Sequence, residues 1–340
     1  MTPLHKTEKI SVLLPTYNEA RHIENCITRV LTNGYPPSQI EILVIDGGSY
    51  DGTREIVEAM RATTPQIQIL DNPKRLPYPA LNIGLAKASG KIIMRVDARA
   101  VIPDHYIETL YETSQKTGAD NVGGLQKPIV DGSVWKQSIA YATMSVFGTG
   151  GARFRCGGAS GYVDTVYLGF FKREIFDRVG RFDEEGSFIS EDSMFNKRLI
   201  DAGGKVYLNS EMVVLYHGKD SMFALARQYF IYGAAKYHSI ATHKKFTAWR
   251  QYIPLVSMGA FYLNLIGIFV FPKLIYSLIL GLTLYCAATL TASLAITVQT
   301  RRPIFFPPLL LIFPTIHFSW ANGFFLHALL KKRLARLFKR

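Results

Sequence analysis

The chain has 340 residues, of which 48% are hydrophobic, and its net charge of +13 gives an isoelectric point near 9.5. Such a charge can indicate nucleic-acid binding. However, no Asp or Glu follows Asp220 whereas 14 Lys and Arg do, so the first 220 residues, with 25 basic and 26 acidic side chains, are nearly neutral. The excess charge lies beside long apolar runs, which is typical of a membrane surface and argues against a nucleic-acid-binding protein.

Strands and helices alternate over the first part of the chain. The apolar segments KISVLLP, IEILVID, IQIL and KIIMRVD are predicted strands, and helices are predicted over residues 20–31, 54–62 and 77–90, with Thr53 opening the second helix. This alternation predicts an α/β domain with a mostly parallel, Rossmann-like sheet. Ligands bind beyond the carboxyl ends of such strands. Those ends carry PTYNE, DGGSYDGT and DAR, so we expect these three polar clusters to converge on one crevice.

The following region continues the same domain. A further strand is predicted over 119–129, and the Gly-rich segment 148–165 is expected to be a mobile loop beside a site. Glu191 and Asp192 begin a predicted helix, where the macrodipole favours acidic side chains. A dinucleotide-binding Rossmann domain would need G-x-G-x-x-G after the first strand, and that position holds PTYNEA without glycine.

Four segments carry a family resemblance when they are taken together. SVLLPTYNEARHIENCI, ILVIDGGSYDGT, NIGLAKASGKIIMRVDA and ISEDSMFNKRL occur in this order. In order and spacing they resemble family 2 inverting glycosyltransferases of the GT-A fold, and within that family most of all the ExoA-type enzymes of succinoglycan-like exopolysaccharide synthesis. The resemblance runs from about Ile10 to Tyr237 and implies a nucleotide-sugar donor, with a UDP-sugar expected.

The resemblance also implies donor-binding residues. The first-strand loop would position the base and ribose, the end of the second strand would accept a hydrogen bond from the base, and the Gly-Gly turn matches the family's nucleotide-binding element. The residues concerned are Pro15, Tyr17, Glu19, Asp46, Ser49 and Asp51. For the turn there is a second interpretation, compatible with the first, in which Asp51 or Thr53 caps the next helix.

A metal position is implied at VDAR. Asp97 matches the first acid of the family's D-x-D element, where Mg²⁺ or Mn²⁺ would bridge the donor phosphates as a Lewis acid. Arg99 stands where a second acid is expected and has no lone pair to offer a metal. It would either pair with a donor phosphate oxygen or point to solvent. His217, in VVLYHG, is either a further metal ligand or a structural histidine.

Inverting transfer needs one base that takes the proton of the acceptor hydroxyl during in-line attack at the anomeric carbon. The resemblance gives this role to Asp192, with Glu191 beside it. The alternative is that the two acids only stabilise the helix N-terminus. Asp183, in GRFDEE, is expected to be a turn residue or an acceptor contact.

The Q-x-x-R-W element of processive synthases is altered here. Gln228 is present in RQYFIYG, but Ile231 replaces the Arg and Tyr232 replaces the Trp, with Arg227 as a partial substitute. This change argues against processive polymerisation. Residues 222–240 also mix aromatic and basic side chains as an interfacial helix does, which would place the active site over a lipid-linked acceptor.

The last third is predicted to lie in the membrane. Runs 254–271 and 274–298 are each long enough to span it, and 303–330 is expected to re-enter or to lie in the interface, three full spans being the alternative. A buried hairpin of a soluble protein would need a charged face, which these runs lack. Basic flanks indicate a cytoplasmic catalytic domain in a multi-pass protein of the inner (cell) membrane. No signal peptide is expected, because the N-terminus is polar.

The predicted organisation is a GT-A domain over 9–220, interfacial amphipathic helices over 221–252, a transmembrane or re-entrant region over 253–330 and a basic cytoplasmic tail over 331–340. The predicted function is transfer of one sugar from a nucleotide-diphosphate donor to a polyprenyl-linked saccharide. A polyprenyl-phosphate sugar synthase is the near alternative. A catalytically silent donor-binding scaffold is the alternative of another class, favoured by Arg99 and Ile231 and opposed by the intact acids. The three cysteines indicate neither a disulfide framework nor a zinc site.

Overall fold

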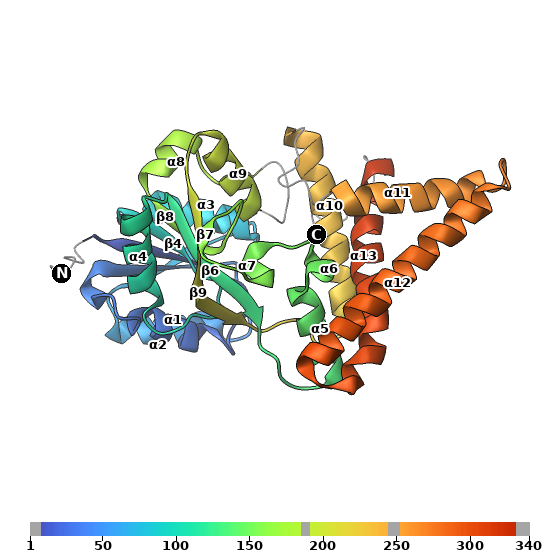
Figure 1. Ribbon diagram of the computed structural model, residues 1–340. Coiled ribbons are helices and arrows are strands. Elements are labelled where there is room, and N and C mark those ends of the chain that lie inside the picture. Colours follow the sequence, from blue (N-terminus) through green and yellow to red (C-terminus); the bar gives the residue numbers. More distant parts are fainter. Residues whose placement is uncertain (1–7, 185–190, 244–251, 331–340) are drawn as a thin grey trace. The chain divides into compact units, whose positions relative to one another are not determined.

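The computed structural model describes residues 8–184, 191–243 and 252–330 (Figure 1). The chain divides into two compact units. The first comprises Met1–Lys127 and Gly157–His217, and the second comprises Pro128–Cys156 and Gly218–Arg340. Residues 128–156 thus group with the C-terminal helices rather than with the sheet that precedes them in the chain.

Four parallel strands form the first half of the sheet in the first unit. They are β1 (Ile10–Thr16), β2 (Ile40–Asp46), β3 (Ile67–Asp71) and β4 (Ile92–Arg95), in the spatial order β3-β2-β1-β4. Thr16 is in register with Asp46, and Asp46 with Asp71. The polar residues that follow these strands therefore start from one edge of the sheet, as the alternation of strands and helices predicts.

The second half of the sheet is antiparallel. β8 (Tyr167–Lys172) pairs with β4 and with β6 (Asn121–Pro128), while β9 (Val206–Tyr216) pairs with β5 (Ala100–Val101) and β7 (Gly161–Tyr162). The predicted α/β class and Rossmann-like GT-A sheet are confirmed, but the sheet is mixed rather than mostly parallel. Local pattern alone does not distinguish the two, because direction is set by the connections between strands.

Helices cover both faces of this sheet (Figure 1). On one face lie α1 (Ile23–Leu31), α2 (Thr53–Thr63) and α4 (Tyr106–Thr117), and on the other lie α3 (Pro77–Lys87), α8 (Glu174–Val179) and α9 (Glu191–Asp201). Alternate strand residues such as Val12, Val44 and Met94 are buried in the first layer. On the opposite face α3 approaches the sheet closely at Gly84, where an added Cβ would lie 2.9 Å from a methyl carbon of Leu13.

The second unit is helical. It contains α5 (Val134–Met144), α6 (Val146–Thr149), α7 (Arg153–Cys156), α10 (Met222–His243), α11 (Tyr252–Gly267), α12 (Leu274–Thr300) and α13 (Phe306–Leu329). Short 3₁₀ turns occur at Pro37–Gln39 in the first unit and Pro303–Phe305 in the second. The core of this unit joins Leu225 of α10, Ile139 of α5, Ile296 of α12 and Phe313 of α13.

Helix lengths differ from those expected for the apolar runs. Leu274–Thr300 and Pro303–Leu329 have the length and apolarity to cross a membrane, whereas α11 has only 16 residues. Gly267 ends α11 ahead of Pro272, and both residue types disfavour helix continuation. Conversely, Pro307 and Pro308 lie in the first turn of α13, where a missing N–H is tolerated, and only Pro314 is interior, so these prolines do not interrupt the helix.

Apolar side chains cover the outer surface of α11 and α12. Leu263 is 72% exposed, Leu284 63% and Val298 67%, and only 17% of the apolar window of α12 is buried within the protein. A soluble protein rarely leaves contiguous apolar patches of this kind in water. The surface of these two helices is therefore suited to an apolar surrounding.

Candidate active site

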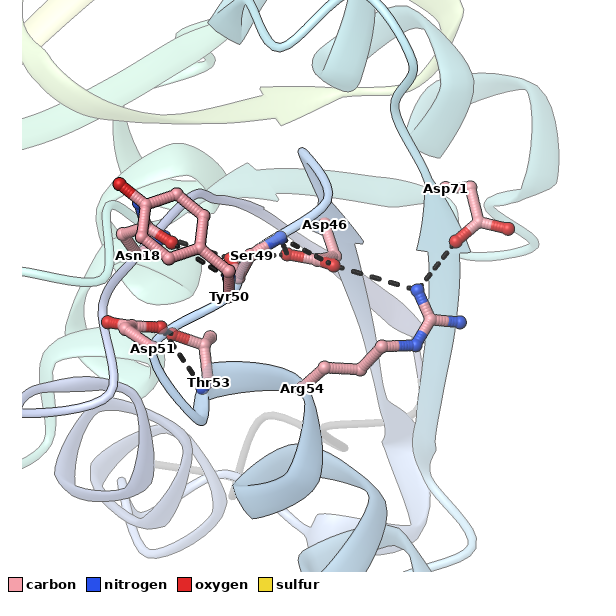
Figure 2. Close-up of polar contacts among 8 residues, drawn as sticks. All are labelled: Asn18, Asp46, Ser49, Tyr50, Asp51, Thr53, Arg54 and Asp71. Carbon is pink, nitrogen blue, oxygen red and sulfur yellow. Dashed lines mark hydrogen bonds and ion pairs between the residues drawn. The ribbon is translucent and has the colours of Figure 1, made fainter.

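The loop after β1 is hydrogen-bonded to the turn after β2. The backbone N–H of Asn18 donates to Ser49 Oγ (2.9 Å), and the N–H of Tyr50 donates back to Asn18 Oδ1 (3.1 Å) (Figure 2). Asn18 adopts a left-handed backbone conformation, with φ of 54°, which asparagine tolerates better than most residues. The two predicted donor-binding segments PTYNE and DGGSYDGT thus form one structure.

A second pair of bonds continues this junction toward α2. The N–H of Glu19 donates to Thr53 Oγ1 (2.8 Å) and that of Ala20 to Asp51 Oδ2 (3.1 Å). Asp51 Oδ1 also accepts the backbone N–H of Thr53 (3.1 Å), the first residue of α2 (Figure 2). A hydrogen bond from the Thr53 hydroxyl is the main cause that lowers the pKa of Asp51. Asp51 therefore joins the β1 loop to the start of α2, whose N-cap position is held by Gly52 without a side-chain cap, so neither Asp51 nor Thr53 is the N-cap.

Asp46 lies beneath the turn and is 2% exposed. Its Oδ1 accepts the Ser49 hydroxyl at 2.6 Å, and its Oδ2 lies 3.6 Å from Arg54 Nη1. The same Arg54 nitrogen is 2.6 Å from Asp71 at the end of β3 (Figure 2). Each carboxylate oxygen has two lone pairs. A nucleoside base could therefore bond to the Asp46 carboxylate while Ser49 and Arg54 keep their contacts with the same oxygens.

Tyr17 provides an aromatic surface at the rim of this turn. Its ring is 38% exposed, the Arg75 guanidinium lies 5.7 Å from its centroid, and the ring of Tyr50 meets it edge-on at 6.3 Å. Gly47 permits the close approach, because an added Cβ would lie 3.1 Å from Tyr17 Cδ2. Pro15, two residues earlier, is inside β1 in register with Ile45, so it shapes the strand that ends at this rim.

Arg99 forms an ion pair that the sequence did not indicate. Its Nε lies 2.8 and 2.9 Å from the two carboxylate oxygens of Glu19. Glu19 is largely buried, and this burial raises its pKa. Arg99 acts against that shift, while Asp51 and Asp97 add to it. Arg99, expected to meet phosphate or solvent, has a side chain that is 51% exposed and is paired with a predicted donor-binding acid.

Arg95 connects the predicted metal position to the predicted base. Its Nε donates to Asp97 Oδ1 at 2.8 Å, and its Nη1 donates to Asp192 Oδ1 at 2.6 Å. The Arg95 side chain is 10% exposed, against 32% for Asp97 and 29% for Asp192. Asp192 comes from the first turn of α9, and Asp97 lies two residues after the end of β4. The fold thus brings together two acids that are far apart in the sequence. The side chain of Glu191 lies outside the described part of the structure.

Tyr167 supports Asp97 from within the sheet. It is the first residue of β8, and its hydroxyl is hydrogen-bonded to Asp97 and to Gln126. Burial raises the pKa of Tyr167 well above its usual value, and the negative charge of Asp97 adds to this shift. A neutral hydroxyl therefore accompanies the Asp97 carboxylate.

His217 follows β9 and packs against a second histidine. Tyr216 pairs with Ala100, which brings this strand end beside the segment that follows Asp97. The ring of His217 lies 4.7 Å from the ring of His22, with an interplanar angle of 31°. Burial, followed by the positive charges of His217 and Arg99, lowers the pKa of His22. His217 is thus placed near the predicted metal position, in contact with His22.

Comparison of the sequence with known protein families identifies the family of this chain. The sequence model described as "Glycosyl transferase family 2" matches residues 11–180. The chain belongs to glycosyltransferase family 2. The matched segment contains the β1 loop, the β2 turn, Arg95 and Asp97, whereas α9 with Asp192 lies beyond it.

Relatives of this family 2 glycosyltransferase extend over nearly the whole chain. It is 29% identical to the succinoglycan biosynthesis protein ExoA of Rhizobium meliloti, over 92% of this chain and 93% of that one. It is 26% identical to a dolichyl N-acetyl-α-D-glucosaminyl phosphate 3-β-D-2,3-diacetamido-2,3-dideoxy-β-D-glucuronosyltransferase of Methanococcus voltae, over 93% and 96% of the two chains. The predicted resemblance to ExoA-type glycosyltransferases is confirmed.

A solved structure shares the fold. The mannosyltransferase PcManGT from Pyrobaculum calidifontis, in complex with GDP-Man and Mn²⁺, covers 96% of this chain and 89% of its own, with a TM-score of 0.60 at 19% identity. At this identity the likeness establishes the architecture alone. It confirms the GT-A fold that the sequence predicts.

The residues at the predicted metal position fit a divalent ion in a limited way. Among the described residues no three or more His, Cys, Asp or Glu side chains form a group that could hold a metal. Asp97, however, supplies a partly exposed carboxylate, the oxygen ligand that Mg²⁺ and Mn²⁺ prefer. One carboxylate from the protein is compatible with an ion that takes most of its other ligands from substrate phosphates and water.

Sequence reasoning overlooked three arginines at this edge. Arg95 precedes Asp97 by two residues in an otherwise apolar buried strand, so strand alternation already places both on one face. Arg54 and Arg75 follow the second and third strands, where basic side chains are well placed for an anionic ligand.

Gln228 and Tyr232 lie one turn apart on α10 in the second unit, joined by a 2.9 Å hydrogen bond. Asp183 lies in the irregular segment after α8, near Arg198.

Proposed function

We propose that this glycosyltransferase transfers one sugar, with inversion, from a nucleotide-diphosphate donor to a lipid-linked saccharide at a membrane surface. The pair of acids on Arg95 carries the proposal. Asp192 and Asp97 approach one guanidinium from two elements, at the carboxyl edge of the parallel strands. Ligands of open α/β sheets bind at this edge, and it is where a base and a phosphate-side carboxylate are both needed.

The nucleoside would bind over the turn after β2. Tyr17 offers a partly exposed ring beside the Arg75 guanidinium, and a flat base gains from stacking on an aromatic side chain. Asp46 and Ser49 would meet the polar edge of the base or ribose. Glu19, paired with Arg99, would face the ribose and the diphosphate. UDP is the nucleotide expected from the sequence, and the related mannosyltransferase structure is a complex with GDP-Man, so both nucleotides belong in a donor screen.

The chemistry assigns separate tasks to the two acids. Asp192 accepts the proton of the acceptor hydroxyl as its oxygen attacks the anomeric carbon, and the donor diphosphate leaves from the opposite side, which inverts the configuration. Asp97, with His217 as a second candidate, would hold a divalent ion, which supplies Lewis-acid stabilisation of the leaving diphosphate when bound. Arg99 provides a fixed positive charge in the loop between Asp97 and β5.

The acceptor side of the proposal rests on the helical unit. The exposed apolar surfaces of α11 and α12 suit lipid, and the basic residues of the last third suit the cytoplasmic face of a bilayer. One relative is named for succinoglycan synthesis, and the name of another describes a dolichyl-phosphate-linked sugar as its acceptor. A polyprenyl-linked saccharide at the inner (cell) membrane accords with both features.

A donor-hydrolysis and transfer screen tests this function. Full-length protein in detergent is incubated with UDP- and GDP-sugars, with and without Mn²⁺, and released nucleotide diphosphate is measured. Asp192→Asn should lower turnover by about 10²- to 10⁴-fold, the range for loss of a general base. Asp104→Asn is the control, because that side chain is 93% exposed and outside the site. Equal turnover by wild type and Asp192→Asn would contradict the assignment of the base.

Three further outcomes separate the alternatives. Full activity with unchanged Mn²⁺ dependence in Asp97→Ala would contradict the metal assignment. Donor binding without turnover, whatever acceptor is supplied, would favour a catalytically silent scaffold. Transfer to polyprenyl phosphate, but not to a polyprenyl-diphosphate saccharide, would identify a polyprenyl-phosphate sugar synthase instead.

A further inference from the structure

We propose that Arg95 is a positioning residue that holds Asp192 in place and competes with a divalent cation for Asp97. The inference deepens the proposed function and rests on it for the roles of the two acids. Arg95 itself would contact neither the donor nor the acceptor. Its role would be to set where the base stands and when the ion-binding carboxylate becomes available.

The position of Arg95 follows from the strand. Ile92 and Met94 of β4 are buried in one helical layer of the core, so Arg95 and Asp97 project to the opposite face. Arg95 is in register with Leu13 of β1, inside the sheet, and only 8% of the residue is exposed. A charge at such a depth is strongly unfavourable without partners. The two carboxylates provide them.

The geometry of the guanidinium decides what it can do. Nε meets Asp97 at 2.8 Å and Nη1 meets Asp192 at 2.6 Å, so two donor groups of one rigid plane fix two acids at once. Arginine presents its donors in such a fixed fork, whereas lysine offers a compact point charge on a flexible stem. Asp192 is in the first turn of α9, so this bond is a tie between that helix end and the sheet.

The same bond bears on metal binding. A carboxylate that ligates Mg²⁺ or Mn²⁺ must give the ion a lone pair, and Asp97 already shares its oxygens with Arg95 and the Tyr167 hydroxyl. The positive charge of Arg95 would also repel a divalent ion held by Asp97. Asp97 by itself is therefore a weak site for a free ion, and the negative charge of the donor diphosphate would offset the repulsion.

These features predict an unusual combination of effects for Arg95→Met. Removing the guanidinium should raise the affinity for Mn²⁺ alone, by about 5-fold or more, because a competing cation has gone. It should also lower kcat by about 10- to 100-fold, because Asp192 loses its fixed orientation, while the donor KM changes less than about 3-fold. Arg95→Lys should keep Mn²⁺ affinity near the wild-type value and restore only part of kcat.

The experiment uses full-length protein in detergent and two independent readouts. Free Mn²⁺ is followed by its electron paramagnetic resonance signal during titration without nucleotide, and kcat and KM are measured with the donor found in the screen. Arg173→Met is the matched control. Arg173 follows β8, and its guanidinium donates to the backbone oxygens of Ala88 and Gly90, before the start of β4. It should change neither Mn²⁺ affinity nor the ratio of kcat to KM.

Failure of this inference can be told from failure of the proposed function. Unchanged or weaker Mn²⁺ binding in Arg95→Met, measured on protein whose thermal unfolding matches that of Arg173→Met, would overturn the role of Arg95. Parallel losses in Arg95→Met and Arg95→Lys, with no gain in Mn²⁺ affinity, would also overturn it in favour of a structural role. Absence of turnover in the wild type with every donor would contradict the proposed function, while the Mn²⁺ titrations would still decide the role of Arg95.

Discussion

The two units of the molecule use polar groups in opposite ways. In the sheet unit, charged side chains from distant elements meet, as Arg95 meets Asp192 from α9 and Arg99 meets Glu19. In the helices α11–α13, polar side chains bond mainly to the backbone of their own helix, as Thr291 does to the carbonyl of Ala287. The first arrangement joins elements that are far apart in the chain, and the second pairs the polar group of a side chain within one helix.

This difference reflects the surroundings for which each unit is suited. The sheet buries alternate apolar residues, and water outside drives that burial. The helices leave apolar side chains on their outside, so their association depends on close packing and on hydrogen bonds between helices. Tyr262 bonds to Asn322 across two helices (2.8 Å), and Tyr285 reaches His317 at 3.0 Å. Such bonds are typical of helix packing in lipid.

The largest expected effect tests the surroundings of α12. We expect the double substitution Leu284→Lys and Leu290→Lys, at side chains 63% and 48% exposed, to prevent stable insertion. A lysine at the centre of a membrane helix costs about 2.5–3.5 kcal/mol, so two lysines give a clear loss. The readout is the fraction of chain that stays with membranes after alkaline carbonate washing.

Val298→Lys is the matched control for that experiment. Val298 is 67% exposed but lies at the end of α12, near Arg301 and Arg302, where a lysine reaches the interface at little cost. If the double variant is retained as well as the wild type and Val298→Lys, α12 does not cross the hydrocarbon core. That result would remove the contrast between the two units.

The next effect concerns the crossing of α10 and α13. An added Cβ at Gly233 would overlap the carbonyl oxygen of Trp320, and one at Gly323 would overlap that of Phe230. The backbones meet at these glycines, so Gly233→Ala should force the helices apart and destabilise the helical unit by about 3 kcal/mol, the upper part of the range for overpacking. Thermal unfolding in detergent measures this loss.

Gly281→Ala gives the reference for that loss. Gly281 lies in α12 with nothing described within 4 Å of an added Cβ, and alanine favours helix by about 1 kcal/mol over glycine. We therefore expect Gly281→Ala to be neutral or stabilising. If both alanine variants unfold at the wild-type temperature, the backbones of α10 and α13 do not meet at Gly233.

The strands and the acids could be predicted from the sequence because each depends on local pattern. Strand β4 with Asp97 at its end, the start of α2 at Thr53, and acids at the start of α9 all follow from periodicity and helix chemistry over a few residues. Local pattern did not predict that Asp97 and Asp192 lie in one site. Only the family resemblance placed these two segments, which are far apart in the chain, in the same active site.

The remaining features depend on contacts that no local pattern contains. In the sequence Arg95 is a single polar residue in an apolar strand. Its bonds to both Asp97 and Asp192 could not be predicted without knowing that α9 begins beside the end of β4. Arg99 was assigned to phosphate or solvent because Glu19, 80 residues earlier, was not known to face it. The apolar runs indicated where helices lie, but their ends depended on Gly267, Pro272 and the turn position of Pro307, which composition over a window averages out.

The smallest expected effect concerns Glu41, a charge of the sheet unit that serves structure alone. It is 5% exposed on β2. It accepts bonds from Ser11 Oγ and from the backbone N of Ser89 (2.6 Å), and it lies 3.0 Å from Lys9 Nζ. Burial by itself would raise the pKa of Glu41, but these bonds and the ion pair outweigh it and lower the pKa from 4.5 to about 2. The carboxylate form is therefore the stabilising one.

The sign of the pH dependence follows from that shift. A pKa lower in the folded than in the unfolded state adds stability above the unfolded value, and this stability is lost as the pH falls from 4.5 toward 2. We expect Glu41→Gln to cost about 2 kcal/mol at pH 7, since glutamine keeps part of the bonding, and progressively less below pH 4.5. Thermal unfolding midpoints at several pH values measure the difference.

Glu58→Gln separates this effect from the general charge of the protein. Glu58 is exposed and pairs with Arg61 on the surface of α2 at 3.3 Å, an arrangement worth at most about 1 kcal/mol. Its substitution should give a small difference at every pH. A Glu41→Gln difference that stays constant from pH 7 to pH 3 would mean that Glu41 is not held as a carboxylate.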